Sequence, residues 1–321
     1  MSIEAKAMNN KIEIFDSELI HENRKILDFI DYWRKALNIE IGWHYDLDFI
    51  WLLNHLKRLN LPRGALIMDA GAGNGLMQFM LAALGYNIVS VDFAERDIPP
   101  AAKLIFDIRQ GSVSAEIEPH RYRLFIQHKG RTRGIFRKIM RAFREPTLAL
   151  GYIENRIRPY LAFPFWKEIS RKKYSYGKIK YVYADFSHLP FLMDQTFDCI
   201  VSVSAIEHCD HEHIKKAIGE FQRLLKPNSC MLITTSVTKD KDWYFKACEG
   251  WCFSLESLKE IFGLEACEHN YNQYDFLFEK IKNNELIKRR ISKVYFASGD
   301  NGLQWGIYEP KYQAAGIIKI K

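Results

Sequence analysis

The sequence lacks two features that would direct it into or across a membrane. No window reaches roughly 18 uninterrupted apolar residues, the length that a membrane-spanning helix requires. The first residues, MSIEAKAMNNKIEIF, carry charges where a signal peptide needs an apolar stretch. We therefore expect no transmembrane helix and a cytoplasmic location.

Paired cysteines are absent as well. The six cysteines, at positions 199, 209, 230, 248, 252 and 267, form no CxxC pair and have no regular spacing. Cys199 and Cys230 fall in apolar runs, where a thiol packs as a small hydrophobic group. This pattern favours a reducing compartment over a disulfide framework.

Apolar residues are abundant, and charge is unevenly distributed. The chain has 321 residues, of which 48% are hydrophobic and 26% charged, so we expect one α/β core that carries additions. Residues 121–180 contain 17 Lys or Arg against three Glu and no Asp, which gives this segment a charge of +14. Because the whole chain carries +7, the remainder carries −7. The protein is an acidic body with one strongly basic segment.

Helical and strand patterns alternate along the chain. Apolar residues recur at three- and four-residue steps between 17 and 60, which predicts an N-terminal helical region over 1–60. The aromatic turn Trp43-His44-Tyr45 interrupts it, and helix packing is the commoner role of such a cluster, with substrate contact as the alternative. Strands are expected over 65–68, 87–91, 181–184, 197–203 and 230–234, helices over 76–84, 212–225 and 254–262, and a closing hairpin over 306–321. The order strand, glycine turn, helix, strand is a βαβ unit and predicts a parallel sheet.

The stretch from Ile67 to Gly75 is the most informative. A strand ends at Asp69, and three glycines follow at alternate positions. Glycines allow positive φ and close backbone approach, and the following helix N-terminus offers free N–H groups to an anionic ligand group. Dinucleotide sites favour a G-x-G-x-x-G spacing, but the third glycine position here is Leu76. An acid at Asp69 would repel a pyrophosphate and attract an amino group, which favours S-adenosylmethionine (SAM) over NAD.

Further motifs follow in a recognisable order. They are Ile67 to Gly75, Asp92, Asp185, Leu189-Pro190-Phe191, Phe197-Asp198-Cys199-Ile200-Val201-Ser202, Ile206-Glu207-His208 and Leu224-Leu225-Lys226-Pro227. Together they resemble class I SAM-dependent methyltransferases, in particular the group that includes the ubiquinone and menaquinone biosynthesis enzymes. Asn228 stands where that group usually has a glycine. The resemblance covers roughly 65–100 and 179–236. It implies a Rossmann-like, mostly parallel seven-stranded sheet with helices on both faces, over 61–100 and 179–321.

The resemblance also implies a set of cofactor-binding residues. The glycine turn would lie under the methionine part of SAM with Asp69 near its amino group, and Asp92 would accept both ribose hydroxyls. Asp185 would bind the adenine amino group, Phe186 would cover the ring, and Ser204 would lie beside the sulfonium. The implied cofactor-binding residues are Asp69, Gly71, Gly73, Gly75, Asp92, Asp185, Phe186 and Ser204.

His208 is the candidate general base for methyl transfer. It follows the fourth core strand, where this fold places acceptors, and Glu207 is the neighbour expected to orient it. The alternative is that both residues begin a helix and only pack there. The run from His208 to His213 matches no zinc pattern, so we expect no metal site, and Asp210 is expected to cap the next helix.

The basic segment lies within a predicted insertion. Asp92 and Asp185 are 93 residues apart, far more than a βαβ step requires, so we place an insertion at 101–178. Residues 134–144 are amphipathic, with arginines beside an apolar face, as in helices that lie on anionic membranes. Three interpretations remain open for this segment: a surface for a membrane or lipid carrier, a nucleic-acid platform, or a cap on the core.

These features predict a SAM-dependent methyltransferase. We expect O-methylation of a small-molecule, lipid-linked or glycan acceptor, with peripheral membrane association through 121–180. An RNA or protein methyltransferase that uses the insertion as a platform is the alternative, although no N/D-P-P-Y/F motif for base-amino methylation follows the fourth strand. The motifs do not identify the acceptor or the oligomeric state.

Overall fold

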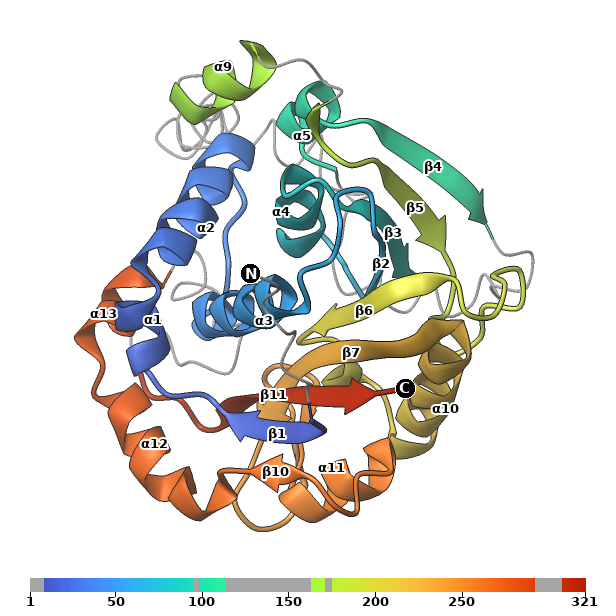
Figure 1. Cartoon of the computed structure of the whole chain (residues 1–321). Coiled ribbons are helices and arrows are strands. Elements are labelled where there is room, and N and C mark those ends of the chain that lie inside the picture. Colours follow the sequence, from blue (N-terminus) through green and yellow to red (C-terminus); the bar gives the residue numbers. More distant parts are fainter. Residues whose placement is uncertain (1–8, 95–97, 114–162, 171–174, 292–307) are drawn as a thin grey trace, which may run out of the picture.

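The computed structural model describes residues 9–94, 98–113, 163–170, 175–291 and 308–321. Its main feature is a nine-stranded sheet (Figure 1). In sheet order the strands are β10 (Glu268–His269), β1 (Lys11–Ile14), β11 (Gln313–Ile320), β7 (Leu225–Val237), β6 (Phe197–Val203), β2 (Leu66–Ala70), β3 (Asn87–Asp92), β5 (Ile179–Tyr183) and β4 (Ile108–Val113). Within this sheet β11 alone runs antiparallel to its neighbours. The Rossmann-like, mostly parallel class predicted from the sequence is confirmed.

Strand β2 marks a reversal in the order of the sheet. From β2 the chain moves outward to β3 and to the edge strand β4, and β5 then inserts between those two. The chain next returns to place β6 on the opposite side of β2. Ile67 pairs with Ile88 of β3 and with Cys199 of β6, and all three side chains are buried. Ligands of open α/β sheets bind beyond the carboxyl ends of the strands at such a reversal. The topology therefore directs the site to the segments that follow β2, β3 and β6.

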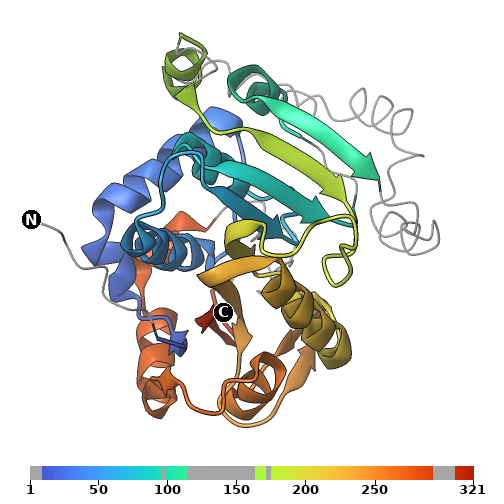
Figure 2. The same cartoon turned by 45° about the vertical axis from the view of Figure 1, so that its right-hand side comes forward.

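Helices cover both faces of the sheet (Figures 1 and 2). One hydrophobic cluster joins the sheet to helices from the first third of the chain, and the other joins it to helices that follow β6. The first group is α2 (Arg24–Leu37), α3 (Tyr45–Leu59), α4 (Met77–Ala83) and α5 (Pro100–Ile105). The second is α10 (His211–Leu224), α11 (Leu255–Phe262) and α12 (Tyr274–Lys282). The N-terminal helices thus share one core with the sheet.

The ends of the chain depart from the expectations. The helical prediction for 17–60 is confirmed by α1 (Glu18–Glu22), α2 and α3, but residues 11–14 form β1 and join the sheet. The tail contributes the single strand β11 between β7 and β1, where a hairpin was predicted. The prediction of seven strands was too low by two. The strands at the two edges of the sheet, β10 and β4, are stabilised by long-range pairing, which local patterns do not reveal.

Salt bridges hold the C-terminal part against the N-terminal helices. Arg290 ends α13 (Glu285–Arg290) and donates to Asp31 of α2 and Asp46 of α3, each with a closest distance of 2.7 Å. A bidentate guanidinium between two carboxylates is a strong and directional contact. This contact fixes α2 against α3, whose adjoining residues line the cavity described below.

Part of the predicted insertion belongs to the core. Helix α5 and strand β4 lie within 101–178 apart from Pro100, and β4 pairs with β5. Helix α9 (Phe163–Ser170) packs against α2 and α5. The amphipathic segment 134–144 lies outside the described residues. None of the described helices has the length and apolar character needed to cross a membrane.

Candidate active site

A cavity of about 550 Å³ opens beyond the carboxyl ends of β2, β3 and β6. This volume lies within the range of about 300–1,000 Å³ that is common for small-molecule sites. Its lining comes from segments that are distant in sequence. They are residues 39–49 before and in α3, the turn after β2, the turn after β3, Phe186, residues 203–209, and the segment at Cys248 and Glu249.

The glycine turn after β2 forms the floor of the cavity. Gly71 and Gly73 have φ values of 68° and 48°, the left-handed region that glycine adopts without strain. A Cβ on Gly71 would lie 2.5 Å from the Cβ of Ala205, so this turn passes directly against the segment after β6. The predicted turn glycines, including Gly75, all line the cavity.

Asp92 binds the glycine turn and can still accept further hydrogen bonds. Its Oδ2 accepts the N–H of Gly73 at 2.7 Å, and its Oδ1 accepts the N–H of Ala94 at 2.8 Å. A carboxylate has about four lone-pair positions, so one position on each oxygen remains. Asp92 lines the cavity while only 7% exposed. A vicinal diol, such as that of a ribose, fits these two remaining positions.

The other predicted cofactor residues divide into two groups. Asp69 and Phe186 line the cavity and are 2% and 4% exposed. Asp185 is not part of the lining, and its Oδ1 accepts from the N–H of Ser187 at 2.8 Å and pairs with His213 at 3.0 Å. Burial raises the pKa of Asp185, but the contacts with His213 and Ser187 outweigh it and hold the pKa at about 2. Binding of adenine by Asp185 stays a prediction.

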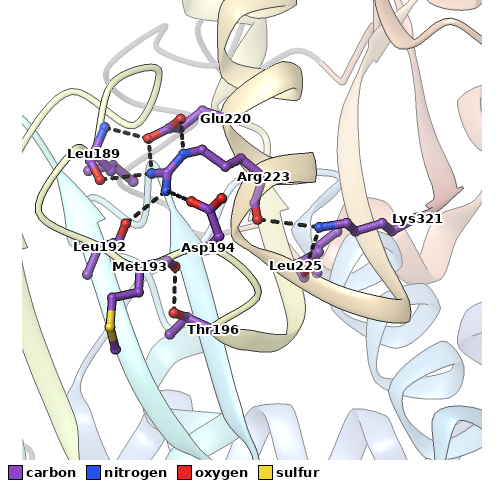
Figure 3. A network of polar contacts seen from close by, with 9 residues as sticks. All are labelled: Leu189, Leu192, Met193, Asp194, Thr196, Glu220, Arg223, Leu225 and Lys321. Carbon is purple, nitrogen blue, oxygen red and sulfur yellow. Dashed lines mark hydrogen bonds and ion pairs between the residues drawn. The ribbon is translucent and has the colours of Figure 1, made fainter.

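A polar network fixes the loop that carries Phe186, and the sequence analysis missed it. Arg223, near the end of α10, donates to the carbonyls of Leu189 and Leu192 and to the carboxylates of Asp194 and Glu220 (Figure 3). The contact with Arg223 holds the pKa of Glu220 below its usual value. Glu220 in turn accepts from the N–H of Leu189 at 2.7 Å. The network therefore ties the segment after β5 to α10.

Ser204 and Glu207 form a hydrogen-bonded pair in the wall of the cavity. Ser204 lines the cavity in a left-handed conformation, with φ at 47°, and its hydroxyl donates to Oε1 of Glu207 at 2.5 Å. Thr235 donates to the other oxygen of Glu207 at 3.1 Å. Glu207 is 3% exposed and does not bind His208. The prediction that Glu207 orients His208 was wrong, because Glu207 accepts from Ser204 and Thr235 while the ring of His208 contacts the carbonyl of Glu249.

The backbone of a hairpin loop orients His208 instead. Its Nδ1 lies 2.9 Å from the carbonyl oxygen of Glu249, in the loop between β8 (Trp243–Phe245) and β9 (Gly250–Cys252). A carbonyl only accepts, so Nδ1 carries the hydrogen, and in the neutral ring Nε2 offers a lone pair. Gly250 permits this approach, since a Cβ there would lie 3.3 Å from Cγ of Glu207. His208 lines the cavity.

The other histidines of this region have separate partners. Asp210 caps α10 by accepting from the N–H of His213, as predicted. His211 pairs with Asp242 at 2.7 Å, and His213 pairs with Asp185. Across the described ranges, no three His, Cys, Asp or Glu side chains converge in a way that could hold a metal ion.

The aromatic turn before α3 divides between the core and the cavity. Trp43 and His44 are 2% and 3% exposed, which agrees with a packing role, whereas Tyr45 lines the cavity. Nδ1 of His44 lies 2.6 Å from Oδ2 of the fully buried Asp48. Burial lowers the pKa of His44, but Asp48 and, more weakly, the charge of Glu207 outweigh it, so the pKa lies above its usual value.

Comparison with known families agrees with this geometry. Residues 161–233 match a family model described as a methyltransferase domain. The match spans β5, β6 and α10, and it includes Phe186, Ser204 and His208. Over these residues the chain therefore carries a methyltransferase domain. The glycine turn and Asp92 lie outside the matched segment and line the same cavity as Phe186, Ser204 and His208. No curated protein sequence matches the chain significantly.

Solved structures with similar folds are distant in sequence. They include a SAM-dependent methyltransferase from Methanosarcina mazei, with 12% identity, a TM-score of 0.39, and coverage of 83% of this chain and 96% of that one. The 1,6-didemethyltoxoflavin-N1-methyltransferase of Burkholderia thailandensis has 17% identity, a TM-score of 0.38, and coverage of 76% and 77%. Phosphoethanolamine N-methyltransferase 2 of Haemonchus contortus has 13% identity, a TM-score of 0.44, and coverage of 95% and 59%. At this level of similarity they carry no information about the acceptor.

Proposed function

We propose that the methyltransferase domain methylates a hydroxyl oxygen of a small-molecule, lipid-linked or glycan acceptor, with His208 as the general base. The observation that carries this proposal is the contact between Nδ1 of His208 and the carbonyl of Glu249, because it leaves Nε2 as a proton acceptor on the cavity. A hydroxyl is a weak nucleophile near neutral pH, so a positioned general base that accepts its proton accelerates oxygen methylation.

SAM supplies an electrophilic methyl group when it is bound. The glycine turn, Asp69 and Asp92 would hold the cofactor, and residues 39–49 with Phe186 would exclude water from it. SAM would give its methyl group to the acceptor oxygen and leave as S-adenosylhomocysteine, while Nε2 of His208 would accept the hydroxyl proton. The protein mainly aligns the two reactants, which by itself can lower the barrier substantially.

Replacement of His208 tests the assignment of the base. His208→Ala is expected to lower kcat by about 100-fold or more with little change in SAM affinity, because a general base contributes about 10²–10⁴ to rate. The measurement is S-adenosylhomocysteine (SAH) formation with a cell lipid or glycan extract that wild-type protein methylates with labelled SAM. Added imidazole should restore part of the rate. His269→Ala, on exposed edge strand β10, is the matched control. A variant with unchanged kcat would remove His208 from the mechanism.

The basic segment motivates a second part of the proposal. Residues 121–180 carry a net charge of +14, and we expect them to bring the enzyme to an anionic membrane surface on the cytoplasmic side, near a lipid-linked acceptor. The competing candidate is an RNA or protein methyltransferase that uses the same charge as a platform. The apolar stripe within 134–144 favours the membrane, because backbone binding of RNA needs no such stripe.

Vesicle binding separates these candidates. The protein is expected to sediment with vesicles containing phosphatidylserine at physiological salt, and not with pure phosphatidylcholine vesicles. Replacing Arg133, Arg137, Lys138 and Arg141 by Gln should weaken binding at least about 10-fold, since each basic residue near the surface contributes about 1 kcal/mol. No sedimentation with anionic vesicles would remove the membrane proposal, and tight binding of single-stranded RNA in that case would favour the alternative.

A further inference from the structure

A buried carboxylate sets the direction of a hydrogen bond at the acceptor end of the cavity. Glu207 is 3% exposed and takes the hydroxyl hydrogens of both Ser204 and Thr235. A serine hydroxyl has one hydrogen and two lone pairs. Because the hydrogen of Ser204 is used by Glu207, its oxygen can only accept a further hydrogen bond. Ser204 therefore presents an acceptor to the cavity that it lines.

Hydrogen bonds keep this buried carboxylate in place. Each oxygen of Glu207 accepts one hydroxyl hydrogen, from Ser204 and from Thr235. A buried charge that keeps its hydrogen bonds costs much less free energy than one that loses them.

The neighbouring polar groups of the lining also include hydrogen-bond acceptors. His208 can also accept a hydrogen bond, because Glu249 uses the hydrogen on Nδ1 and Nε2 carries a lone pair whenever the ring is neutral. Glu40 and Glu249 add carboxylates to the lining, and no lysine or arginine occurs among its described residues. The lining also includes the apolar and aromatic side chains of Ile39, Ile41, Tyr45 and Phe49.

We propose that this end of the cavity selects an acceptor with an apolar body and a hydrogen-bond-donating head group, a hydroxyl or an ammonium, and excludes carboxylates and phosphates. The proposal rests on the proposed function, because it concerns the acceptor side of the same cavity. An anionic head group would meet the accepting oxygen of Ser204 and the carboxylates of Glu40 and Glu249, and no lysine or arginine of the described lining would offset its charge. Unpaired charges of this kind are strongly disfavoured. Ser204 is then a specificity-determining residue, and Glu207 positions its hydroxyl.

Three matched probes test the selection: 2-phenylethanol, 2-phenylethylammonium and phenylacetate. Their binding is measured by calorimetry on the full chain saturated with SAH. The alcohol and the ammonium are expected to bind at least about 10-fold more tightly than phenylacetate, the difference that one unpaired buried group makes. Equal or tighter binding of phenylacetate overturns the proposal. Absence of binding by all three probes overturns it as well, because a small apolar body is then not accepted.

Two variants connect the selection to the Ser204–Glu207 pair. The amide of Glu207→Gln has only one accepting oxygen, so one hydroxyl hydrogen is released, and the preference against phenylacetate is expected to fall about 10-fold. Ser204→Gly removes the hydroxyl while relieving the left-handed conformation, so it should fold and also lose the preference. Thr235→Val is the control, since it removes a hydrogen bond to Glu207 without altering the lining, and it should keep the wild-type preference.

The result for SAH separates this inference from the proposed function. SAH is titrated first, and failure to bind it would contradict the cofactor site itself. Binding of SAH with an unchanged probe preference in both Glu207→Gln and Ser204→Gly would contradict only the role of the pair.

Discussion

Asp92→Ala is expected to weaken SAM binding by at least about 100-fold. The variant removes the hydrogen bonds that Asp92 is positioned to accept from the ribose, and bonds to a charged group contribute about 1.5–3 kcal/mol each. It also releases the N–H of Gly73 in the glycine turn, which Asp92 accepts at 2.7 Å. Both effects act on the cofactor, so the loss should be seen in direct titration calorimetry with SAM and with SAH.

The control for Asp92 is an exposed acid on the same protein. Glu212 lies on α10 with its side chain 77% exposed, and Glu212→Ala should bind SAM as the wild type does. Thermal unfolding without cofactor shows whether Asp92→Ala is folded. Unchanged SAM affinity in a folded Asp92→Ala protein would remove Asp92 from the cofactor site.

Gly71→Ala is expected to lower the free energy of unfolding by about 2–5 kcal/mol and to abolish SAM binding. The left-handed backbone at Gly71 costs a non-glycine residue about 1–2 kcal/mol, and overpacking adds about 1–3 kcal/mol. The overpacking arises because the new Cβ would lie 2.5 Å from the Cβ of Ala205. Relief of this contact would displace either the glycine turn or the segment after β6, and both line the cavity.

A double variant separates the two costs. Gly71→Ala with Ala205→Gly removes the opposing methyl group, so about 1–3 kcal/mol of stability should return while the cost of the backbone conformation remains. Gly73→Ala has a left-handed backbone without a close neighbour, since its Cβ would be 4.0 Å from Asp92, and should cost only about 1–2 kcal/mol. Denaturant unfolding without cofactor gives the free energy of unfolding of the wild type, the two single variants and the double variant. Equal losses in Gly71→Ala and Gly73→Ala would contradict the steric explanation.

The glycine turn and the acid at Asp92 could be predicted because their environment is local. A buried apolar strand, an acid and alternating glycines are adjacent in the chain, and together they specify a strand, a left-handed turn and a helix. The cap of α10 by Asp210 was predicted for the same reason, since its partner His213 is three residues away. Such contacts depend on neighbouring residues alone.

The pairing of the two chain ends could not be predicted from local patterns. Strands β1 and β11 come from opposite ends of the chain and pair with each other, Lys11 opposite Ile318. Their short apolar segments also suit other conformations, and only burial within the sheet and against the helices selects the strand. The central strands β5, β3, β2, β6 and β7 were each anticipated, because each contains several apolar residues in a short segment.

The sequence by itself determined that this protein forms a mostly parallel α/β sheet with a glycine turn after its first core strand, because these features depend on residues that are adjacent in the chain. The tertiary structure decided what each polar group of the site faces. Glu207 turns from His208 to Ser204 and Thr235, and the carbonyl of Glu249, 41 residues along the chain, orients His208. Those choices depend on which distant segments pack together, and the spacing of residues along a chain does not specify that packing.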